Sequence, residues 1–164
     1  MFTTDKVGHG YLPTYMSIIA SLGIKPRILE VGIANGDGLR MFRTLSPHCD
    51  LWGVDINTGA TWPEGVHKVI TSQDSMDLVN AIPDDFDLIV DDASHHNYLT
   101  TTTLKNLWPK VVSKGYYIVE DWSHVSGICM QLATDLVRNF VDGSIIQDVE
   151  SITYKDGLII LRKK

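Results

Sequence analysis

Residues 27–38 have the sequence Arg-Ile-Leu-Glu-Val-Gly-Ile-Ala-Asn-Gly-Asp-Gly, and this stretch decides the fold class. Its first six residues predict a short buried strand, and Gly36 and Gly38 lead into a helical pattern over 39–45. Small residues between a strand and a helix let the backbone approach a ligand closely, and the helix N-terminus adds partial positive charge there. The stretch therefore predicts a strand–turn–helix unit of an α/β fold with a ligand site at the turn.

Outward from this unit, apolar runs of strand length alternate with helical patterns. This alternation predicts an α/β fold: a Rossmann-like doubly wound sheet, mostly parallel, with an antiparallel C-terminal strand. We expect a single domain over residues 1–164, in which the helical segment 1–24 packs on or over a site at the carboxyl ends of the strands. The further strands are expected at 51–55, 66–71, 86–91, 116–120, about 144–153 and 157–162, with a hairpin turn at 155–157, and the helices at 12–22, 75–82, 98–112 and 127–141.

The composition is that of an ordinary globular domain. The chain has 164 residues, of which 44% are hydrophobic and 21% charged, and its net charge is −6. These values exclude the disordered, collagen-like and membrane classes. An acidic domain without a basic run is a poor partner for a phosphate backbone, so we expect neither nucleic acid nor a membrane as a partner.

The cysteines and the first apolar segment predict a cytoplasmic protein. Cys49 and Cys129 lack metal-ligand spacing and are too few for a disulfide framework, which indicates a reducing compartment. No cationic region closely precedes the apolar segment 15–24, and no small-residue cleavage site follows it before residues 25–27. We therefore interpret this segment as a helix of the domain rather than a signal peptide.

The glycine turn excludes the common phosphate-binding motifs. A dinucleotide fingerprint would need glycine at positions 34 and 37, where this chain has Ala34 and Asp37, and a carboxylate would repel a pyrophosphate. There is no P-loop motif in the chain. An acidic residue at the end of the first strand, Glu30, instead suits a ligand with a cationic amino group. The alternative is a plain tight turn between a strand and a helix.

A second acidic residue, Asp55, ends the second strand. A carboxylate at this position can accept both hydroxyls of a ribose, as in nucleotide-binding α/β folds generally. The alternative interpretation is a solvated aspartate at a strand end. Together with the glycine turn, Asp55 favours the ribose role.

Four carboxylates follow two strands that the fold places side by side. Asp91 and Asp92 end the fourth strand, and Glu120 and Asp121 end the fifth. Neighbouring strands lie about 5 Å apart, so these charges repel by a few kcal/mol and need protons or a cation. Oxygen ligands favour Mg²⁺, or Ca²⁺ or Mn²⁺. His95 follows closely and, with a reference pKa of about 6.5, suits a general base.

The alternative for this cluster is structural. Asp91 and Asp121 would then only cap helices, and His95 would be an exposed loop residue. The coincidence of acidic residues at two adjacent strand ends favours the site.

The motifs together resemble known methyltransferases. Glu30-x-Gly32-x-Ala34-x-Gly36 resembles motif I, E/D-x-G-x-G-x-G, of the class I S-adenosylmethionine-dependent methyltransferases, with Ala34 in place of the middle glycine. Residues 91–95, Asp-Asp-Ala-Ser-His, and Glu120-Asp121 resemble the D-D-G-S-H and E-D motifs of the Mg²⁺-dependent macrolide-sugar O-methyltransferases of the macrocin and mycinamicin type, which are related to cephalosporin hydroxylase-like proteins. Asp5-Lys6, His9, Tyr11 and Tyr15 are similar to the start of that family.

The resemblance implies a complete set of roles. Asp92, Glu120 and Asp121 would hold Mg²⁺ or another divalent cation, and His95 would be the base that removes a proton from a hydroxyl of a small, sugar-like or natural-product acceptor. The segment 1–24 would fold over the cofactor or substrate. S-adenosylmethionine would be bound by Glu30, Gly32, Ala34, Gly36, Asp55, Gln73, Asp74 and Asp91, with residues 72–75 at the adenine.

Other functions stay open at this point. One is a non-catalytic S-adenosylmethionine-binding module, and another is a metal-dependent hydrolase that uses the same carboxylates. A hydroxylase with a redox iron would need two histidines on one ion, which the adjacent pair His95-His96 rarely permits. The sequence leaves open the acceptor, the identity of the metal, whether the chain forms a homo-oligomer, and the roles of His96, Trp62 and Trp122.

Overall fold

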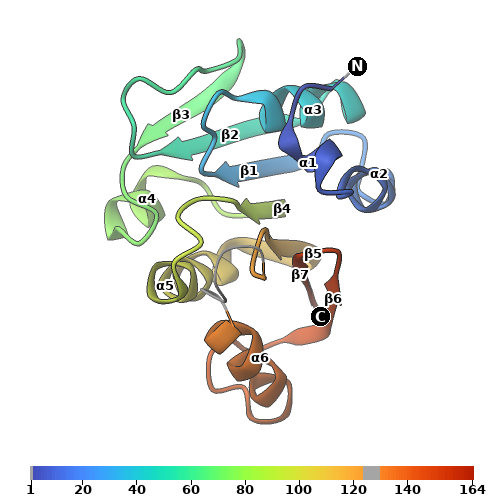
Figure 1. Cartoon of the computed structure of the whole chain (residues 1–164), viewed down its shortest axis with the longest axis vertical. Helices are drawn as coiled ribbons and strands as arrows, with labels where there is room; N and C mark the ends of the chain where they lie inside the picture. The colour runs from blue at the N-terminus through green and yellow to red at the C-terminus, as the bar shows by residue number, and fades with distance from the viewer. Residues whose placement is uncertain (1, 124–129) are drawn as a thin grey trace.

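The computed structural model describes residues 2–123 and 130–164, which contain a seven-stranded sheet (Figure 1). Its strand order is β3-β2-β1-β4-β5-β7-β6. The pairs from β3 to β5 are parallel, whereas β7 runs antiparallel to both β5 and β6. The predicted fold class is therefore confirmed. The strands are β1 Arg27–Val31, β2 Asp50–Asp55, β3 Val66–Ile70, β4 Phe86–Asp91, β5 Val111–Val119, β6 Val149–Lys155 and β7 Leu158–Lys163.

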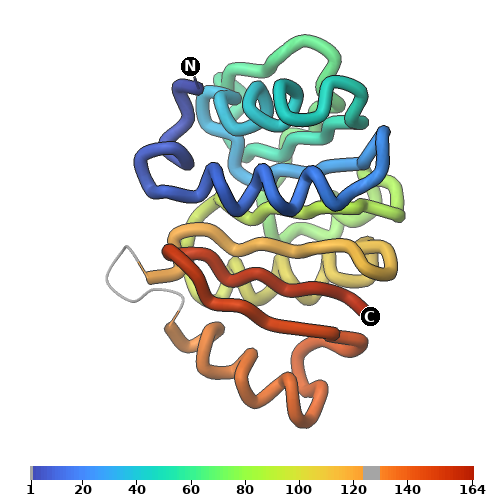
Figure 2. The backbone as a smooth tube through the Cα atoms, turned by 90° about the vertical axis from the view of Figure 1, so that its right-hand side faces the viewer, coloured from blue at the N-terminus to red at the C-terminus, as the bar shows by residue number. Residues whose placement is uncertain are grey.

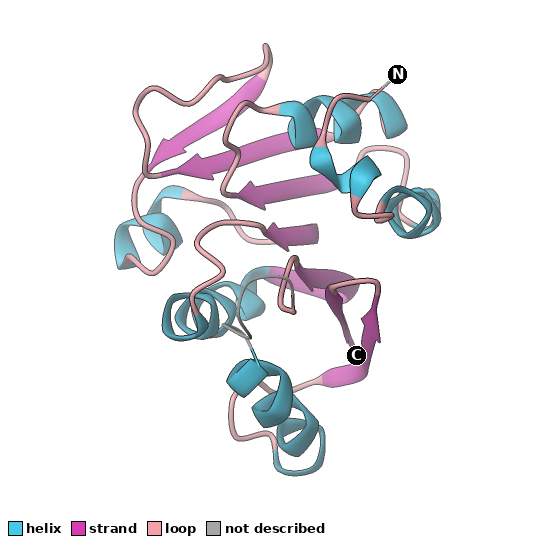
Figure 3. Ribbon diagram, viewed as in Figure 1, coloured by secondary structure: helices cyan, strands magenta, loops and turns pink. Residues whose placement is uncertain are grey.

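Helices cover both faces of the sheet (Figures 1 and 3). Apolar side chains of α2 and α3 pack on one face, and those of α4, α5 and α6 pack on the other, which gives two buried clusters separated by the sheet. The backbone trace shows the blue N-terminal segment running alongside the sheet before β1 (Figure 2). The helices are α1 Asp5–Gly8, α2 Leu12–Ser21, α3 Asp37–Leu45, α4 Met76–Ala81, α5 Asn97–Leu107 and α6 Met130–Asp142, with a 3₁₀ turn at Trp108–Lys110.

Several element boundaries differ from the sequence expectation. Helix α5 ends at Leu107 instead of 112, because Pro109 has no N–H to continue the helix and only a 3₁₀ turn follows. Strand β5 consequently begins at Val111, five residues earlier than expected, and β6 begins at Val149 instead of 144. Helix α1 lies within the helical segment expected at 1–24, although only residues 12–22 were assigned there as a helix. Residues 127–129 of the last expected helix, with Cys129, lie outside the described residues.

The predicted hairpin turn is confirmed. Asp156 and Gly157 join β6 to β7 and have φ angles of 50° and 88°. Two successive residues with positive φ are typical of a type I′ turn, which suits the twist of the two strands. The turn therefore reverses the chain and lets β7 pair antiparallel with β6.

Within the two described ranges, the longest helices are too short or too polar to cross a membrane. Cys49 is buried and free.

The register of the central strands brings the acidic residues to one edge. Asp91 pairs with Val31 of β1 and with Val119 of β5. Beyond these pairs, the Asp92 N–H donates to the Val31 carbonyl at 2.8 Å and the Glu120 N–H donates to the Asp91 carbonyl at 3.0 Å. The carboxyl ends of three neighbouring strands thus meet where ligands bind in open α/β sheets.

The Gly32→Ala variant is expected to lose at least about 2 kcal/mol of folding stability. Gly32 has a φ of 85°, and a Cβ there would lie 2.3 Å from the Asp92 carbonyl oxygen. Both the backbone conformation and the contact penalise a side chain at this point. Chemical denaturation of Gly32→Ala, with Gly23→Ala as the control whose Cβ would meet nothing within 4 Å, measures the effect. Equal midpoints for the two variants would contradict it.

Candidate functional site

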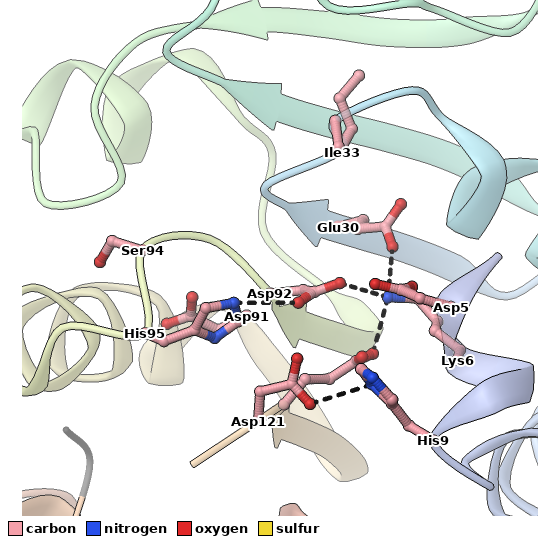
Figure 4. Close-up of polar contacts among 12 residues, drawn as sticks. Asp5, Lys6, His9, Glu30, Ile33, Asp91, Asp92, Ser94, His95 and Asp121 are labelled. Atoms are coloured by element: carbon pink, nitrogen blue, oxygen red, sulfur yellow. Dashed lines mark hydrogen bonds and ion pairs between the residues drawn. The ribbon is translucent and has the colours of Figure 1, made fainter. Parts of the chain in front are cut away.

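A buried lysine from the N-terminal segment lies among the strand-end carboxylates (Figure 4). The Lys6 Nζ is 2.6 Å from Asp92 Oδ2, 2.9 Å from Glu120 Oε1 and 3.2 Å from Glu30 Oε1. Lys6, Glu30 and Glu120 are each only 1% exposed. One buried ammonium therefore joins the ends of β1, β4 and β5.

The same N-terminal segment also supplies two tyrosines and a histidine. The buried Tyr11 hydroxyl donates to Asp121 Oδ1 at 2.5 Å, and the buried Tyr15 hydroxyl donates to Glu120 Oε1. His9 Nδ1 lies 3.4 Å from the same oxygen of Asp121. Residues 6–15 thus contact the acidic groups at the ends of β4 and β5 through several separate side chains, which anchors this segment at the edge of the sheet.

Burial shifts the protonation equilibria of this cluster. Desolvation raises the pKa of Glu30 to about 7, although Lys6 opposes the shift, and in the same way raises the pKa of Glu120 to about 8. Burial opposes the positive charge of Lys6, but Glu30, Glu120 and Asp92 outweigh it and hold the lysine pKa well above its usual value. These carboxylates therefore depend on nearby positive charge to stay ionised.

Asp92, His95 and Asp121 form a group that could hold a metal ion. One ligand atom from each of the three residues lies within 4.8 Å of the others. His95 Nε2 is 3.7 Å from Asp92 Oδ1, the carboxylate oxygen opposite the one that binds Lys6. Glu120, predicted as a ligand with Asp92 and Asp121, is outside this group, and its Oε1 contacts Lys6 and Tyr15.

The turn after β1 forms a second polar centre. Ala34 has a φ of 46°, the left-handed conformation that favours glycine, and it occupies the position of the middle glycine in the motif. The N–H groups of Ile33 and Ala34 both donate to Asp55 Oδ2 at 3.1 Å, and the Asn57 N–H donates to Asp55 Oδ1 at 2.8 Å. These bonds fix the orientation of the Asp55 carboxylate while each oxygen retains capacity for another donor.

A cavity of about 340 Å³ lies over the ends of β1 and β2. Five of the residues predicted to bind a cofactor or metal line it, namely Gly32, Ala34, Asp55, Gln73 and Asp92. The Gln73 Oε1 accepts the Ser94 N–H at 3.1 Å, so this side chain also holds the loop after β4. The cavity therefore joins the glycine turn to the end of β4.

Three predicted cofactor residues do not line the described cavities. Asp91 is buried and accepts the Tyr117 hydroxyl at 3.3 Å, and burial raises its pKa to about 7. Asp74 accepts the Ser72 hydroxyl beside the cavity. A Cβ at Gly36 would lie 2.4 Å from the Thr61 carbonyl, so this glycine permits the close approach of the loop after β2. In the structure these three residues therefore make contacts within the protein beside the cavities.

An adjoining cavity of about 490 Å³, the cavity of the acidic cluster, is lined by the carboxylates Glu30, Asp92 and Asp121 together with Lys6 and His95. It shares Gly32, Ala34, Asp92 and Ala93 with the first cavity. Glu30 lines it, and the buried Oε2 of Glu30 has no hydrogen-bond partner among the described residues. A buried carboxylate oxygen without a partner is costly, so this atom points to a cationic or hydrogen-bond-donating ligand. The residues that line this second cavity are Thr3, Thr4, Asp5, Lys6, Glu30, Gly32, Ile33, Ala34, Asn35, Gly38, Asp92, Ala93, His95 and Asp121.

Sequence reasoning did not assign the contacts of Lys6 and Gly38. A Cβ at Gly38 would lie 2.1 Å from Glu30 Oε1 and 2.8 Å from Lys6 Cε, so the missing side chain makes room for this ion pair. The sequence feature that points to this segment is the similarity of its residues to the start of the sugar methyltransferases, at Asp5-Lys6, His9, Tyr11 and Tyr15. That similarity indicates a functional segment but not which carboxylates it contacts.

Curated sugar O-methyltransferases are similar to this chain in sequence. The 8-demethyl-8-(2-methoxy-alpha-L-rhamnosyl)-tetracenomycin-C 3'-O-methyltransferase of Streptomyces olivaceus is 31% identical over 132 residues, which are 72% of this chain and 34% of that protein. The mycinamicin VI 2''-O-methyltransferase of Micromonospora griseorubida is 25% identical over 146 residues, 76% of this chain and 37% of that protein. The chain thus spans about a third of the length of the curated relatives it matches. No family model matches it.

Solved structures show the same fold. The MycE methyltransferase from the mycinamycin biosynthetic pathway, in complex with Mg and SAH, superposes with a TM-score of 0.80 at 19% identity, over 93% of this chain and 49% of that chain. Its complex with Mg, SAH and mycinamycin VI gives a TM-score of 0.78 at 20% identity, over 99% and 50% of the two chains. The sheet and its flanking helices are therefore those of a methyltransferase fold.

Proposed function

Since this chain is related to the class I S-adenosylmethionine-dependent methyltransferases of the mycinamicin and tetracenomycin sugar type, we propose that it transfers a methyl group from S-adenosylmethionine to a hydroxyl of a small acceptor. Residues 1–164 would act as one methyltransferase-like unit. The observation that carries the proposal is the buried Oε2 of Glu30, which has no hydrogen-bond partner among residues 2–123 and 130–164. Glu30 lines a cavity that adjoins the 340 Å³ cavity lined by Asp55, the Asp55 cavity.

The two adjoining cavities suit the two halves of the cofactor. Asp55 is oriented by three backbone N–H groups and offers oxygens to a ribose, and Gln73 lies further along the same cavity toward an adenine. At the other end, Glu30 Oε2 offers a buried negative charge to the α-ammonium group of the methionine part. Gly32 and Ala34 line both cavities, and their small size leaves room for the part of the cofactor that joins its ribose to its methionine portion.

The acidic edge of the sheet suits a divalent cation. Asp92 and Asp121 supply carboxylate oxygens close to one another and to His95, and hard oxygen donors favour Mg²⁺ or Mn²⁺. We assign Asp92 and Asp121 as the carboxylates that hold the cation. Glu120, the third carboxylate of the proposed set, stands beside them with its Oε1 engaged by Lys6 and Tyr15. MycE, which has the same fold, is bound to Mg in its crystal structures.

The residues of this chain then have separate tasks in the reaction. When bound, S-adenosylmethionine supplies an electrophilic methyl group and the divalent cation lowers the pKa of an acceptor hydroxyl. Asp92 and Asp121 would hold the cation beside the acceptor hydroxyl. His95 takes up the hydroxyl proton at an imidazole nitrogen. Glu30 and Asp55 hold the two ends of the cofactor, so that the acceptor oxygen and the methyl group are aligned; positioning of this kind can supply up to about 7–11 kcal/mol.

The relatives suggest the acceptor class. One curated relative is named for O-methylation of a rhamnosyl tetracenomycin, and the other for 2''-O-methylation of mycinamicin VI. We therefore propose a sugar hydroxyl of a glycosylated natural product as the acceptor. A screen with labelled S-adenosylmethionine, Mg²⁺ and a panel of rhamnosyl and related glycosides would identify it.

The Glu30→Gln variant is expected to bind S-adenosylmethionine about 10–100-fold more weakly than the wild type, because a charge-assisted hydrogen bond contributes about 1.5–3 kcal/mol. Calorimetric titration of the cofactor into both proteins, with Mg²⁺ and again with EDTA, measures the change. Asp87→Asn is the matched control, because Asp87 lies at the opposite end of the sheet, where its Oδ2 accepts the Arg27 N–H at 2.8 Å. Equal affinities for Glu30→Gln and Asp87→Asn would contradict the assignment of Glu30.

The same titration separates the rival functions. A non-catalytic binding module would bind S-adenosylmethionine but methylate none of the glycosides. A metal-dependent hydrolase would bind Mg²⁺ without binding the cofactor, and it would leave the Asp55 cavity without a role. Cofactor binding followed by Mg²⁺-stimulated methyl transfer is the result that the proposed function requires.

A further inference from the structure

Three strands send one carboxylate each to the same lysine. Glu30 of β1, Asp92 after β4 and Glu120 after β5 all lie within 3.2 Å of the Lys6 Nζ. Lys6 reaches them from α1, a four-residue helix far from these strands in the chain. The ammonium has three N–H donors, and the three carboxylates match that number.

The geometry of this cluster is that of a site built around a positive charge. Three carboxylates brought so close together repel one another strongly in a buried environment, and an isolated buried charge is costly. Gly38 leaves the space in which the Glu30–Lys6 pair fits. A buried lysine, a glycine and the position of the N-terminal segment therefore together form one site for a positive charge.

We propose that Lys6 is a resident counter-cation and a positioning residue of the reaction centre, which holds Glu30, Asp92 and Glu120 in place before any divalent cation binds. Asp92 connects the two halves of the cluster, since its Oδ2 contacts Lys6 and its Oδ1 faces His95. Lys6 thus joins Glu30, at the cofactor end of the cavity, to the carboxylates at the metal end. This inference rests on the proposed function for its two ends, but its test needs neither cofactor nor acceptor.

A consequence follows for the stability of the protein. A divalent cation held by Asp92 and Asp121 would neutralise part of the same negative charge that Lys6 neutralises. Without the ammonium, only that cation would neutralise the buried carboxylates of the folded state. Because the cation binds the folded state alone, it would stabilise the variant more than it stabilises the wild type. Removal of Lys6 should therefore make the stability of the fold depend on the metal.

Thermal unfolding of Lys6→Met, in EDTA and again in excess Mn²⁺, tests the inference. Methionine retains much of the apolar length of lysine and removes its charge. In EDTA, we expect the melting temperature to fall by about 6–15 °C, because one partner of a buried ion cluster is lost. When EDTA is replaced by Mn²⁺, we expect the melting temperature of the variant to rise by roughly twice as many degrees as that of the wild type.

Lys110→Met is the matched control. Lys110 is also buried, and its Nζ donates to Asp84 Oδ1 at 2.8 Å and to the Ile82 carbonyl at 3.2 Å, away from the acidic edge. This variant should lose stability in EDTA but gain no more from Mn²⁺ than the wild type. An equal Mn²⁺ gain in Lys6→Met and the wild type would overturn the inference, as would a similar enhanced gain in Lys110→Met.

The double variant Lys6→Met/Glu30→Gln covers the case in which Lys6→Met does not fold. It removes one carboxylate together with the ammonium, so it should fold and still show the enlarged Mn²⁺ gain. Failure of the double variant to fold would overturn the inference, because Lys6 would then be needed for packing and not for charge. The result is distinguishable from the proposed function, which stands or falls on cofactor binding and methyl transfer by the wild type.

Discussion

His95→Ala is expected to transfer methyl groups about 10²–10⁴-fold more slowly than the wild type while it binds S-adenosylmethionine with nearly unchanged affinity. The imidazole lies at the acidic edge, with Nε2 3.7 Å from Asp92 Oδ1, and lines the cavity of the acidic cluster but not the Asp55 cavity. Its removal therefore takes away a proton acceptor and leaves the proposed ribose contacts intact. Turnover with the acceptor that the glycoside screen identifies and calorimetric titration of the cofactor measure the two effects.

Two further variants make this result interpretable. His95 has a φ of 54°, and since asparagine tolerates the left-handed conformation well, His95→Asn removes the base with little backbone strain. The neighbouring His96 is exposed and occupies the N-cap position of helix α5, so His96→Ala should retain most of the turnover. Turnover of His95→Asn close to that of His96→Ala would refute the role of His95 as the base.

The position of this histidine shows what the sequence could predict. The alternation of short apolar runs and helical patterns is a local signal, and it was sufficient to assign the parallel sheet and the single reversed strand, β7. Once β4 and β5 are neighbours, the residues that follow them must meet at one edge, whatever their side chains. Asp92, His95 and Asp121 therefore came together as expected from chain position alone.

The pairing within the cluster could not be predicted in the same way. Lys6 and Asp92 are separated by 86 residues, and Tyr11 and Asp121 by 110, so no periodicity connects them. Glu30 was expected to face a cofactor ammonium, and in the structure one of its oxygens pairs with Lys6 while the other has no partner among the described residues. Which buried carboxylate takes which donor depends on side-chain packing in three dimensions, and a pattern along the chain does not contain that information.

Boundary errors have a more local cause. Residues 98–112 have a helical pattern, yet a single proline at 109 ends α5 early and releases Val111 to pair with Phe86 of β4. The site is unaffected, because the carboxyl end of β5 is set by its register with β4 and not by where the strand begins.

Asp121→Asn is expected to weaken Mn²⁺ binding by about 100-fold and to abolish most metal-stimulated turnover, since even outer partners of metal ligands contribute about 10–100-fold to metal affinity. Asp121 has a φ of 52°, a conformation that asparagine accepts readily. The asparagine carbonyl oxygen can still accept the Tyr11 hydroxyl bond that Asp121 Oδ1 accepts at 2.5 Å. The substitution therefore removes the charge and largely preserves the local structure. Calorimetric titration of Mn²⁺ in the absence of cofactor measures the affinity.

Asp156→Asn provides the control for Asp121→Asn, because Asp156 also has a left-handed φ, of 50°, but lies exposed in the turn between β6 and β7. Equal Mn²⁺ affinities in the two variants would rule out Asp121 as a ligand. The melting temperatures in EDTA add a second distinction. Among the described contacts of Lys6 are Glu30, Asp92 and Glu120 but not Asp121, so Asp121→Asn should lose the metal while Lys6 still holds the inner carboxylates. Loss of Mn²⁺ binding without the large loss of stability expected for Lys6→Met would therefore separate the metal-binding role of Asp121 from the stabilising role of the carboxylates that Lys6 holds.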